Sequence, residues 1–327
     1  MKKCFSVVAF ILAGWLCFVQ HAQAQNRPLA KVGVLWGLDA AAIAPYQKAL
    51  AEAMRARGWI EGTNVQFIVR YQEGDLARVP AFVSELIALK VDILYLVANS
   101  VAAARSQTGT IPIVSADFYD PIEEGFTTKL SRPNQNITGI SYQTPESVAK
   151  RLELAKDLIL GLKRVAFLFE AGDRGALIEE KGIRNAARAA KVQLTTYPAR
   201  DLRDIQTAFA AMKNTRPDTL IVSANALTWT SREEIARLSM SIQLPAISEV
   251  SEFATAGFLL TFGPNAMDAY TRGAAVYLDK ILRGARPSEL PIEQPTKFDF
   301  VVNLKTAKAL GVKIPESIML RATEVIR

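Results

Sequence analysis

The amino-acid sequence predicts an α/β protein made of two similar lobes, each built on a parallel sheet that helices cover on both faces. Short, almost wholly apolar segments alternate with longer segments whose apolar residues recur at helical spacing. The apolar segments lack the polar–apolar alternation of half-exposed strands, which is typical of parallel strands buried on both faces. The alternation begins again near residue 145, and a chain of 327 residues is more than one core usually serves.

The first half of the chain carries the first set of alternating segments. The helix expected at 76–89, for example, places Val79, Val83 and Leu86 on one stripe. We expect strands at 31–36, 64–71, 92–97 and 111–115, and helices at 45–58, 76–89 and 100–107.

The second half repeats this order of strands and helices. Ser231 and Glu234 have the spacing of a capping box, so they predict the start of a helix. We expect helices at 145–160, 176–190, 201–213 and 231–241, and strands at 164–169, 192–197, 219–222, 246–247 and 258–261.

The N-terminal residues have the pattern of a cleavable secretory signal. Lys2 and Lys3 precede an apolar run over residues 4–19, and Ala22 and Ala24 complete an Ala-x-Ala cleavage site. The run is shorter than the roughly 20 residues that a spanning helix needs. We therefore expect cleavage near Ala24, residues 1–24 to be a signal peptide and the mature protein to be periplasmic.

Cleavage at this point removes Cys4, Cys17 and the single histidine, His21. The mature chain then has no disulfides, no thiolate nucleophile, no Cys/His zinc site and no histidine base. We expect no cofactor, no metal and no enzymatic activity. The formal net charge falls from +7 to +5 on cleavage, and the basic residues are scattered, so we expect no nucleic-acid binding.

Several long phrases of the sequence are distinctive. They are 120–126 (DPIEEGF), 130–141 (LSRPNQNITGIS), 277–287 (YLDKILRGARP), 293–298 (EQPTKF), 303–311 (NLKTAKALG) and 322–326 (ATEVI). These phrases resemble the periplasmic ABC-transporter substrate-binding family that includes tryptophan-binding members, and the resemblance covers nearly all of the mature chain.

The resemblance implies the type I periplasmic-binding fold, in which two lobes are joined by three crossings. The crossings would lie near 137–142, 261–265 and 295–298. Lobe one would comprise residues 25–139 and 265–296, and lobe two residues 140–264 and 297–327. The implied function is capture of a small polar molecule, an amino acid or a related compound, by closure of the lobes. The implied partner is an ABC permease in the inner membrane, served by a monomer.

Candidate ligand-binding residues follow the predicted strands, because ligands of open parallel sheets bind beyond the carboxyl ends of the strands. In lobe one these are Trp36, Asn99, Ser100, Asp117 and Tyr119. Asn99 and Ser100 begin a helix and suit a ligand carboxylate, and Asp117 suits an ammonium group. Ordinary capping, packing and turn roles remain open for each of them.

The remaining candidates belong to lobe two and to the first crossing. Glu170, Asn225 and Glu249 follow strands of lobe two, and Ser141 and Tyr142 lie at the crossing. Surface exposure or hinge packing remains the alternative for these residues. Together the candidates predict a pocket for a zwitterion or an amide-bearing compound.

Two other functions remain open from the sequence. Asp117 with Glu170, or Glu249 with Glu252, could form an acid–base pair of an enzyme. The same lobes could instead present their ligand to a membrane receptor as a sensory protein. Neighbouring genes for a permease and an ATPase would favour transport, whereas a neighbouring histidine kinase would favour sensing.

Overall fold

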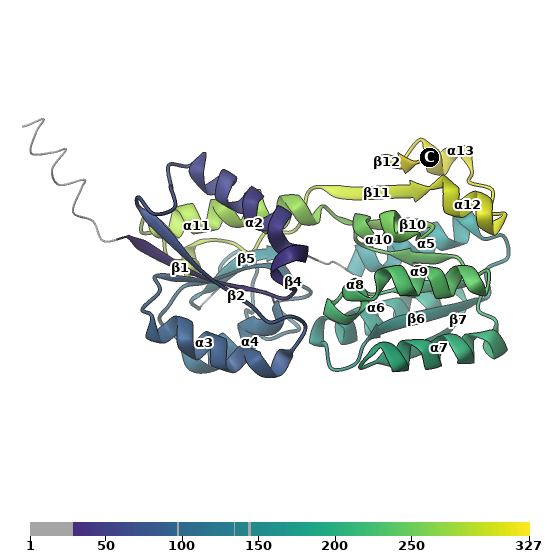
Figure 1. The fold of residues 1–327 in the computed structure, drawn as a ribbon, viewed down its shortest axis with the longest axis horizontal. Coiled ribbons are helices and arrows are strands. Elements are labelled where there is room, and N and C mark those ends of the chain that lie inside the picture. Colours follow the sequence, from purple (N-terminus) through teal and green to yellow (C-terminus); the bar gives the residue numbers. More distant parts are fainter. Residues whose placement is uncertain (1–28, 97, 134, 143–144) are drawn as a thin grey trace, which may run out of the picture.

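A computed structural model describes residues 29–327 except 97, 134 and 143–144. The expected signal peptide, residues 1–24, lies outside the described residues. In the described part, the chain forms two α/β lobes that lie side by side (Figure 1). None of the helices described in this part is both long and apolar enough to cross a membrane. The two largely parallel sheets with their helices confirm the predicted α/β fold class.

Lobe one contains a parallel sheet in the order β2-β1-β3-β4-β5. Its strands are β1 (Ala30–Trp36), β2 (Val65–Tyr71), β3 (Ile93–Leu96), β4 (Ile113–Phe118) and β5 (Ile137–Ser141). Its helices are α2 (Ala40–Arg55), α3 (Val79–Ala88), α4 (Ala98–Gln107) and α11 (Ala274–Leu282), with a π-helical segment at Asp268–Gly273 and 3-10 turns at Leu76–Arg78 and Pro287–Glu289.

The side chains of strand β1 pack against helices on both faces of this sheet. Val32, Val34 and Trp36 pack with residues of α2 and α11, whereas Leu35 packs with residues of α3 and α4. Figure 1 accordingly shows α2 and α11 on one face of the sheet and α3 and α4 on the other. Both faces of β1 exclude water, which is why its sequence is apolar without alternation.

Lobe two contains a sheet in the order β12-β11-β10-β9-β8-β6-β7, parallel except between β10 and β11. Its strands are β6 (Arg164–Glu170), β7 (Gln193–Ala199), β8 (Thr219–Val222), β9 (Ala246–Ser248), β10 (Leu260–Pro264), β11 (Phe298–Asn303) and β12 (Glu324–Ile326). Its helices are α5 (Pro145–Leu158), α6 (Arg174–Ala190), α7 (Leu202–Thr215), α8 (Ala226–Thr230), α9 (Arg232–Ser241), α10 (Ser251–Ala256), α12 (Leu304–Leu310) and α13 (Glu316–Met319).

The chain passes between the two sheets after β5, after β10 and before β11. The second and third passages run side by side, because β10 and β11 pair antiparallel up to Pro264 and Phe298. The strand β5 pairs with β4 from Ile137 to Ser141. The first passage therefore begins where β5 ends, at Ser141.

One helix start differs from the sequence prediction. Ser231 precedes α9 but makes no capping hydrogen bond with its side chain. A capping box instead begins α8, where Asn225 Oδ1 accepts from the backbone N–H of Thr228, and Thr228 Oγ1 accepts from the backbone N–H of Asn225. The cap thus lies at the end of β8 and orients a residue of the candidate site.

Candidate ligand-binding site

A cavity of about 130 Å³ lies between the lobes, beyond the carboxyl ends of strands from both sheets. Residues after β1 and β4 line it from lobe one, and residues after β6 and β8 line it from lobe two. This is the place where open parallel sheets bind ligands. Six of its lining residues are aromatic, namely Trp36, Tyr46, Tyr119, Tyr142, Trp229 and Tyr270.

Tyr270 is the centre of the aromatic wall. Its ring centroid lies 5.9 Å from that of Tyr46, 5.6 Å from that of Tyr142 and 6.4 Å from that of Trp36. The Tyr46 contact is edge-to-face, a favoured geometry for aromatic pairs. Burial raises the pKa of Tyr270 well above its ordinary value, so its hydroxyl stays protonated and donates to Asp117 Oδ2 at 3.3 Å.

Three carboxylates line the same cavity, and no Lys or Arg of the described residues does so. Asp117 Oδ1 also accepts from Ser115 Oγ at 2.9 Å. Glu170 Oε2 accepts from the backbone N–H of Leu227 at 3.1 Å, and burial raises the pKa of this half-buried carboxyl. Asp173 caps α6 by accepting from the backbone N–H of Ala176, and burial raises its pKa as well.

Two buried hydrogen-bond donors of the cavity wall have no partner among the described residues. They are the indole Nε1 of Trp36 and the amide Nδ2 of Asn225, whose residues are 2% and 8% exposed. A buried donor without a partner costs about 1–3 kcal/mol. Trp36 belongs to lobe one and Asn225 to lobe two, so an acceptor on a bound molecule could satisfy donors from both lobes.

Side chains of the two lobes also bond to one another around the cavity. Asn99 Nδ2 donates to Asp173 Oδ2 at 2.6 Å, and Tyr46 Oη donates to Glu252 Oε1 at 2.7 Å. The amide of Asn99, which the sequence assigned to a ligand carboxylate, is therefore engaged with the opposite lobe. Glu252, a candidate for acid–base chemistry, is likewise a partner of Tyr46.

Tyr119 of lobe one also contacts lobe two. Its hydroxyl donates to the backbone oxygen of Ala224 at 3.5 Å. Its ring lies against Gly175 in the first turn of α6, where an added Cβ would come within 2.0 Å of Tyr119 Cδ2. Glycine at position 175 is therefore what allows this contact.

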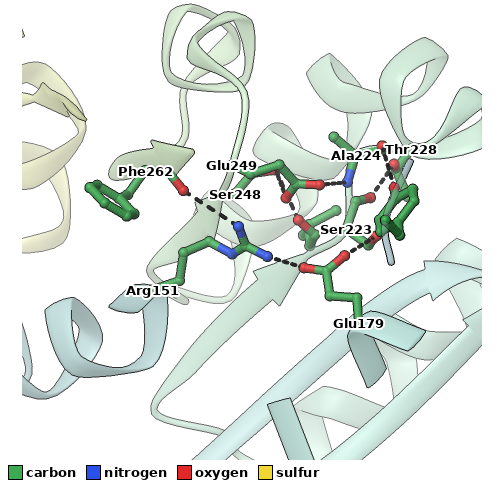
Figure 2. A network of polar contacts seen from close by, with 10 residues as sticks. Arg151, Glu179, Ser223, Ala224, Thr228, Ser248, Glu249 and Phe262 are labelled. Carbon is green, nitrogen blue, oxygen red and sulfur yellow. Dashed lines mark hydrogen bonds and ion pairs between the residues drawn. The ribbon is translucent and has the colours of Figure 1, made fainter. Parts of the chain in front are cut away.

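A buried network of charged and hydroxyl groups supports the lobe-two side of the cavity (Figure 2). Arg151 from α5 pairs with Glu179 from α6, and both side chains are 0% exposed. Glu179 Oε2 also accepts from Ser223 Oγ. Glu249 Oε1 accepts from the backbone N–H of Ala224 at 2.7 Å, so the network holds in place a backbone segment that lines the cavity.

The residues expected at the site fall into two groups, those outside the cavity and those that line it. Ser100, Ser141 and Glu249 do not line the cavity. Ser100 Oγ donates to Gln72 Oε1 at 3.2 Å, and Ser141 Oγ donates to the backbone oxygen of Phe118. Burial, together with the charge of Glu179, raises the pKa of Glu249. Those brought together at the cavity are Trp36, Asn99, Asp117, Tyr119, Tyr142, Glu170 and Asn225.

Sequence reasoning missed several lining residues. Tyr46 and Tyr270 come from a helix and a π-helical segment rather than from strand ends, and Trp229 lies within the short helix α8. Asp173 follows β6 by three residues, so its position near a strand end was a usable signal.

Comparison with known proteins supplies the family. A family model described as ABC transporter substrate binding protein matches residues 31–326. A tyrosine-binding protein of Clostridioides difficile (strain R20291) is 19% identical over 295 residues, covering 90% of this chain and 84% of that protein.

Two solved structures have the same fold. One is a conserved domain protein from Vibrio cholerae, with a TM-score of 0.85 and 24% identity. The other is an ABC domain from Streptococcus pneumonia in complex with L-Trp, with a TM-score of 0.84 and 22% identity. Each comparison covers 91% of this chain and 100% of the other. With the family model spanning nearly the whole described chain, the protein belongs to the family of ABC transporter substrate-binding proteins.

Proposed function

We propose that this protein is the extracytoplasmic solute-binding component of an ABC importer, and that it captures a small polar molecule, an amino acid or a related compound, in the cavity between its lobes. The observation that carries the proposal is that two buried residues lining one cavity from opposite lobes, Trp36 and Asn225, each hold a side-chain donor, Nε1 and Nδ2, that has no partner among the described residues. A solute that accepts from both would link the lobes. The tyrosine-binding relative and the fold shared with an L-Trp complex support an amino acid or a compound like one.

Capture would proceed by closure of the lobes on the solute. A ligand that contacts both lobes stabilises the closed form by the difference between its affinities for the closed and open forms. The passages after β5 and β10 would act as hinges, with Tyr142 Oη donating to the backbone oxygen of Pro264 at 3.2 Å between them. Lobe one would comprise residues 25–139 and 265–296, and lobe two residues 140–264 and 297–327.

The proposed location is the periplasm, after removal of residues 1–24. In this setting the monomeric protein would deliver its solute to a permease in the inner membrane without transforming it. The aromatic wall and carboxylates would hold the solute, while the Arg151 network would keep the lobe-two wall in place.

The proposal is tested on the protein beginning at Gln25. We expect mass spectrometry to find a small molecule that co-purifies, and solution scattering to show compaction when that molecule is returned to the stripped protein. Deleting the gene should abolish uptake of the same molecule by cells. A protein that carries no solute and stays equally extended with every solute tried would contradict the proposal.

A matched pair of tryptophan variants checks the site. Trp36→Phe removes the unpartnered indole donor of a residue that lines the cavity, and we expect affinity for the co-purified solute to fall about fivefold, as one hydrogen bond contributes about 1 kcal/mol. Trp59→Phe serves as the control, because Trp59 Nε1 donates to Asp279 and does not line the cavity. Equal affinities of the two variants would argue against this cavity as the binding site.

A further inference from the structure

The charged side chains among the described residues of the cavity wall are all acidic. Asp117, Glu170 and Asp173 line it, and the wall formed by the described residues contains no Lys or Arg. Arg151 lies in the lobe-two interior at 0% exposure and is paired with Glu179. Arg174 is adjacent to Asp173 but is exposed and not part of the wall. The described wall therefore offers no positive side chain to a solute.

A carboxylate on the solute would be poorly matched to this wall. A buried charge is strongly disfavoured unless an opposite charge or several hydrogen bonds compensate it. The donors without partners, Trp36 Nε1 and Asn225 Nδ2, are neutral, and they belong to residues that line the cavity from opposite lobes. Such separate neutral donors suit a hydroxyl, ether or carbonyl oxygen better than a carboxylate beside three acidic groups.

A positive charge on the solute would be well matched. Carboxylates attract it directly, and the faces of aromatic rings attract cations within about 6 Å of the ring centre. Six aromatic residues line the wall, and three of them, Trp36, Tyr46 and Tyr142, pack around Tyr270 with centroids 5.6–6.4 Å from its own. Carboxylates combined with aromatic rings form the kind of surface that recognises ammonium groups.

We propose that the cavity selects a small organic cation, namely a protonated or quaternary amine attached to an apolar or aromatic group and lacking a carboxylate. Asp117, Glu170 and the aromatic wall would hold the ammonium group. The neutral donors of Trp36 and Asn225 would hold an oxygen elsewhere on the solute. This inference rests on the proposed function, because it names the class of solute that the same cavity captures.

The test compares amines with the amino acids that contain them. Protein beginning at Gln25 is stripped of bound solute, refolded and titrated calorimetrically with tyramine and tyrosine, tryptamine and tryptophan, and choline. We expect each aromatic amine to bind at least about tenfold more tightly than its amino acid, because the added carboxylate loses the hydration that this acidic wall cannot replace. An amino acid that binds as tightly as its amine, or the absence of binding by all three amines, would overturn the inference.

These outcomes separate the inference from the proposed function. If tyrosine or tryptophan binds preferentially and scattering shows compaction, the cation preference is wrong and solute capture stands. If no tested compound binds, the cation preference is again overturned, while the co-purified molecule and uptake by cells still decide solute capture.

Carboxylate variants locate the preference. Asp117→Asn and Glu170→Gln keep acceptor oxygens for Tyr270 and Leu227, so both variants should fold. We expect each variant to bind amines about tenfold more weakly, because it loses a charged partner for the ammonium group. We also expect each to show a smaller preference for the amine over the corresponding amino acid. Glu233→Gln, an exposed carboxylate on α9, is the control and should leave both unchanged. An unaltered preference in both pocket variants would contradict the assignment.

Discussion

Gly175 shows how a single missing side chain controls the distance between the lobes. The ring of Tyr119 occupies the space that a Cβ at position 175 would need. Gly175 lies in the first turn of α6, where alanine would be at least as good a helix former. The position therefore affects the approach of the lobes without affecting the helix itself.

We expect Gly175→Ala to weaken solute binding at least about tenfold, because the Cβ would block the contact with Tyr119 and strained contacts of this kind cost about 1–3 kcal/mol. Scattering should show less compaction on adding the solute, and the melting temperature without solute should not fall. Gly182→Ala is the matched control in the same helix, since its Cβ would meet Val148 Cγ1 at an ordinary 3.4 Å. Wild-type affinity in Gly175→Ala would show that the lobes need not approach this closely.

Glu124 organises the loop that carries Tyr119. Its Oε1 accepts from the backbone N–H groups of Tyr119 and Asp120, at 2.9 and 3.0 Å. Burial raises the pKa of this carboxyl to about 8. Its folded-state pKa thus lies above the value of about 4.3 expected in the unfolded chain.

This shift predicts a pH dependence of stability. The folded protein holds the Glu124 proton more tightly than the unfolded chain, so the stabilisation is complete below about pH 4 and declines as pH rises toward 8. Glu124→Gln retains the acceptor oxygen but carries no proton to lose. We expect the difference in unfolding free energy, wild type minus variant, to fall between about pH 5 and 8 in urea denaturation. A difference that is constant with pH, or rises, would contradict the shifted pKa.

At the scale of elements, α5 and α6 are joined by the buried pair of Arg151 and Glu179. Removing one member of such a pair leaves the other charge buried without its partner, which is more costly than lacking the pair altogether. The pair also lies beside Ser223 at the end of β8, from which the cavity-lining segment 224–226 continues.

We expect Arg151→Met to lower the unfolding free energy by about 3–5 kcal/mol. Replacing both partners, as in Arg151→Met with Glu179→Met, should cost less than the two single substitutions added together. Urea denaturation of the four proteins measures the coupling. Additive losses would indicate that Arg151 and Glu179 do not stabilise each other.

Long elements were predictable from the sequence, and so were the short apolar strands β8 and β9, but several other short elements were not. The apolar run of β6 covers 7 residues and the amphipathic pattern of α6 covers 17 residues, so each is long enough to be recognised from its sequence pattern. Helices α8 and α10 and strand β12 span six residues or fewer and form because neighbouring elements hold them. The capping box at Asn225 was overlooked because Ser231 and Glu234 fit the usual motif more closely.

For the whole molecule, the expectation that ligands bind beyond the carboxyl ends of the strands identified cavity-lining residues in each lobe. It did not identify the hydrogen bonds that join the side chains of the two lobes. Trp36, Asp117 and Glu170 follow strands, and their positions at the cavity follow from the fold class. The bond between Tyr46 and Glu252 joins residues 206 positions apart, and that between Asn99 and Asp173 joins residues 74 apart. No local pattern encodes such pairs, so only the three-dimensional structure reveals that Asn99 is engaged.

These bonds between Tyr46 and Glu252 and between Asn99 and Asp173 have a consequence for selectivity. They join protein to protein, so they contribute the same free energy to closure whichever solute is inside. Strengthening or weakening them would therefore scale every dissociation constant by a common factor and leave the ranking of solutes unaltered. Substitutions in these two bonds between the lobes would change the affinity for all solutes alike. Only substitutions among the aromatic rings and carboxylates that line the cavity would change which solute is preferred.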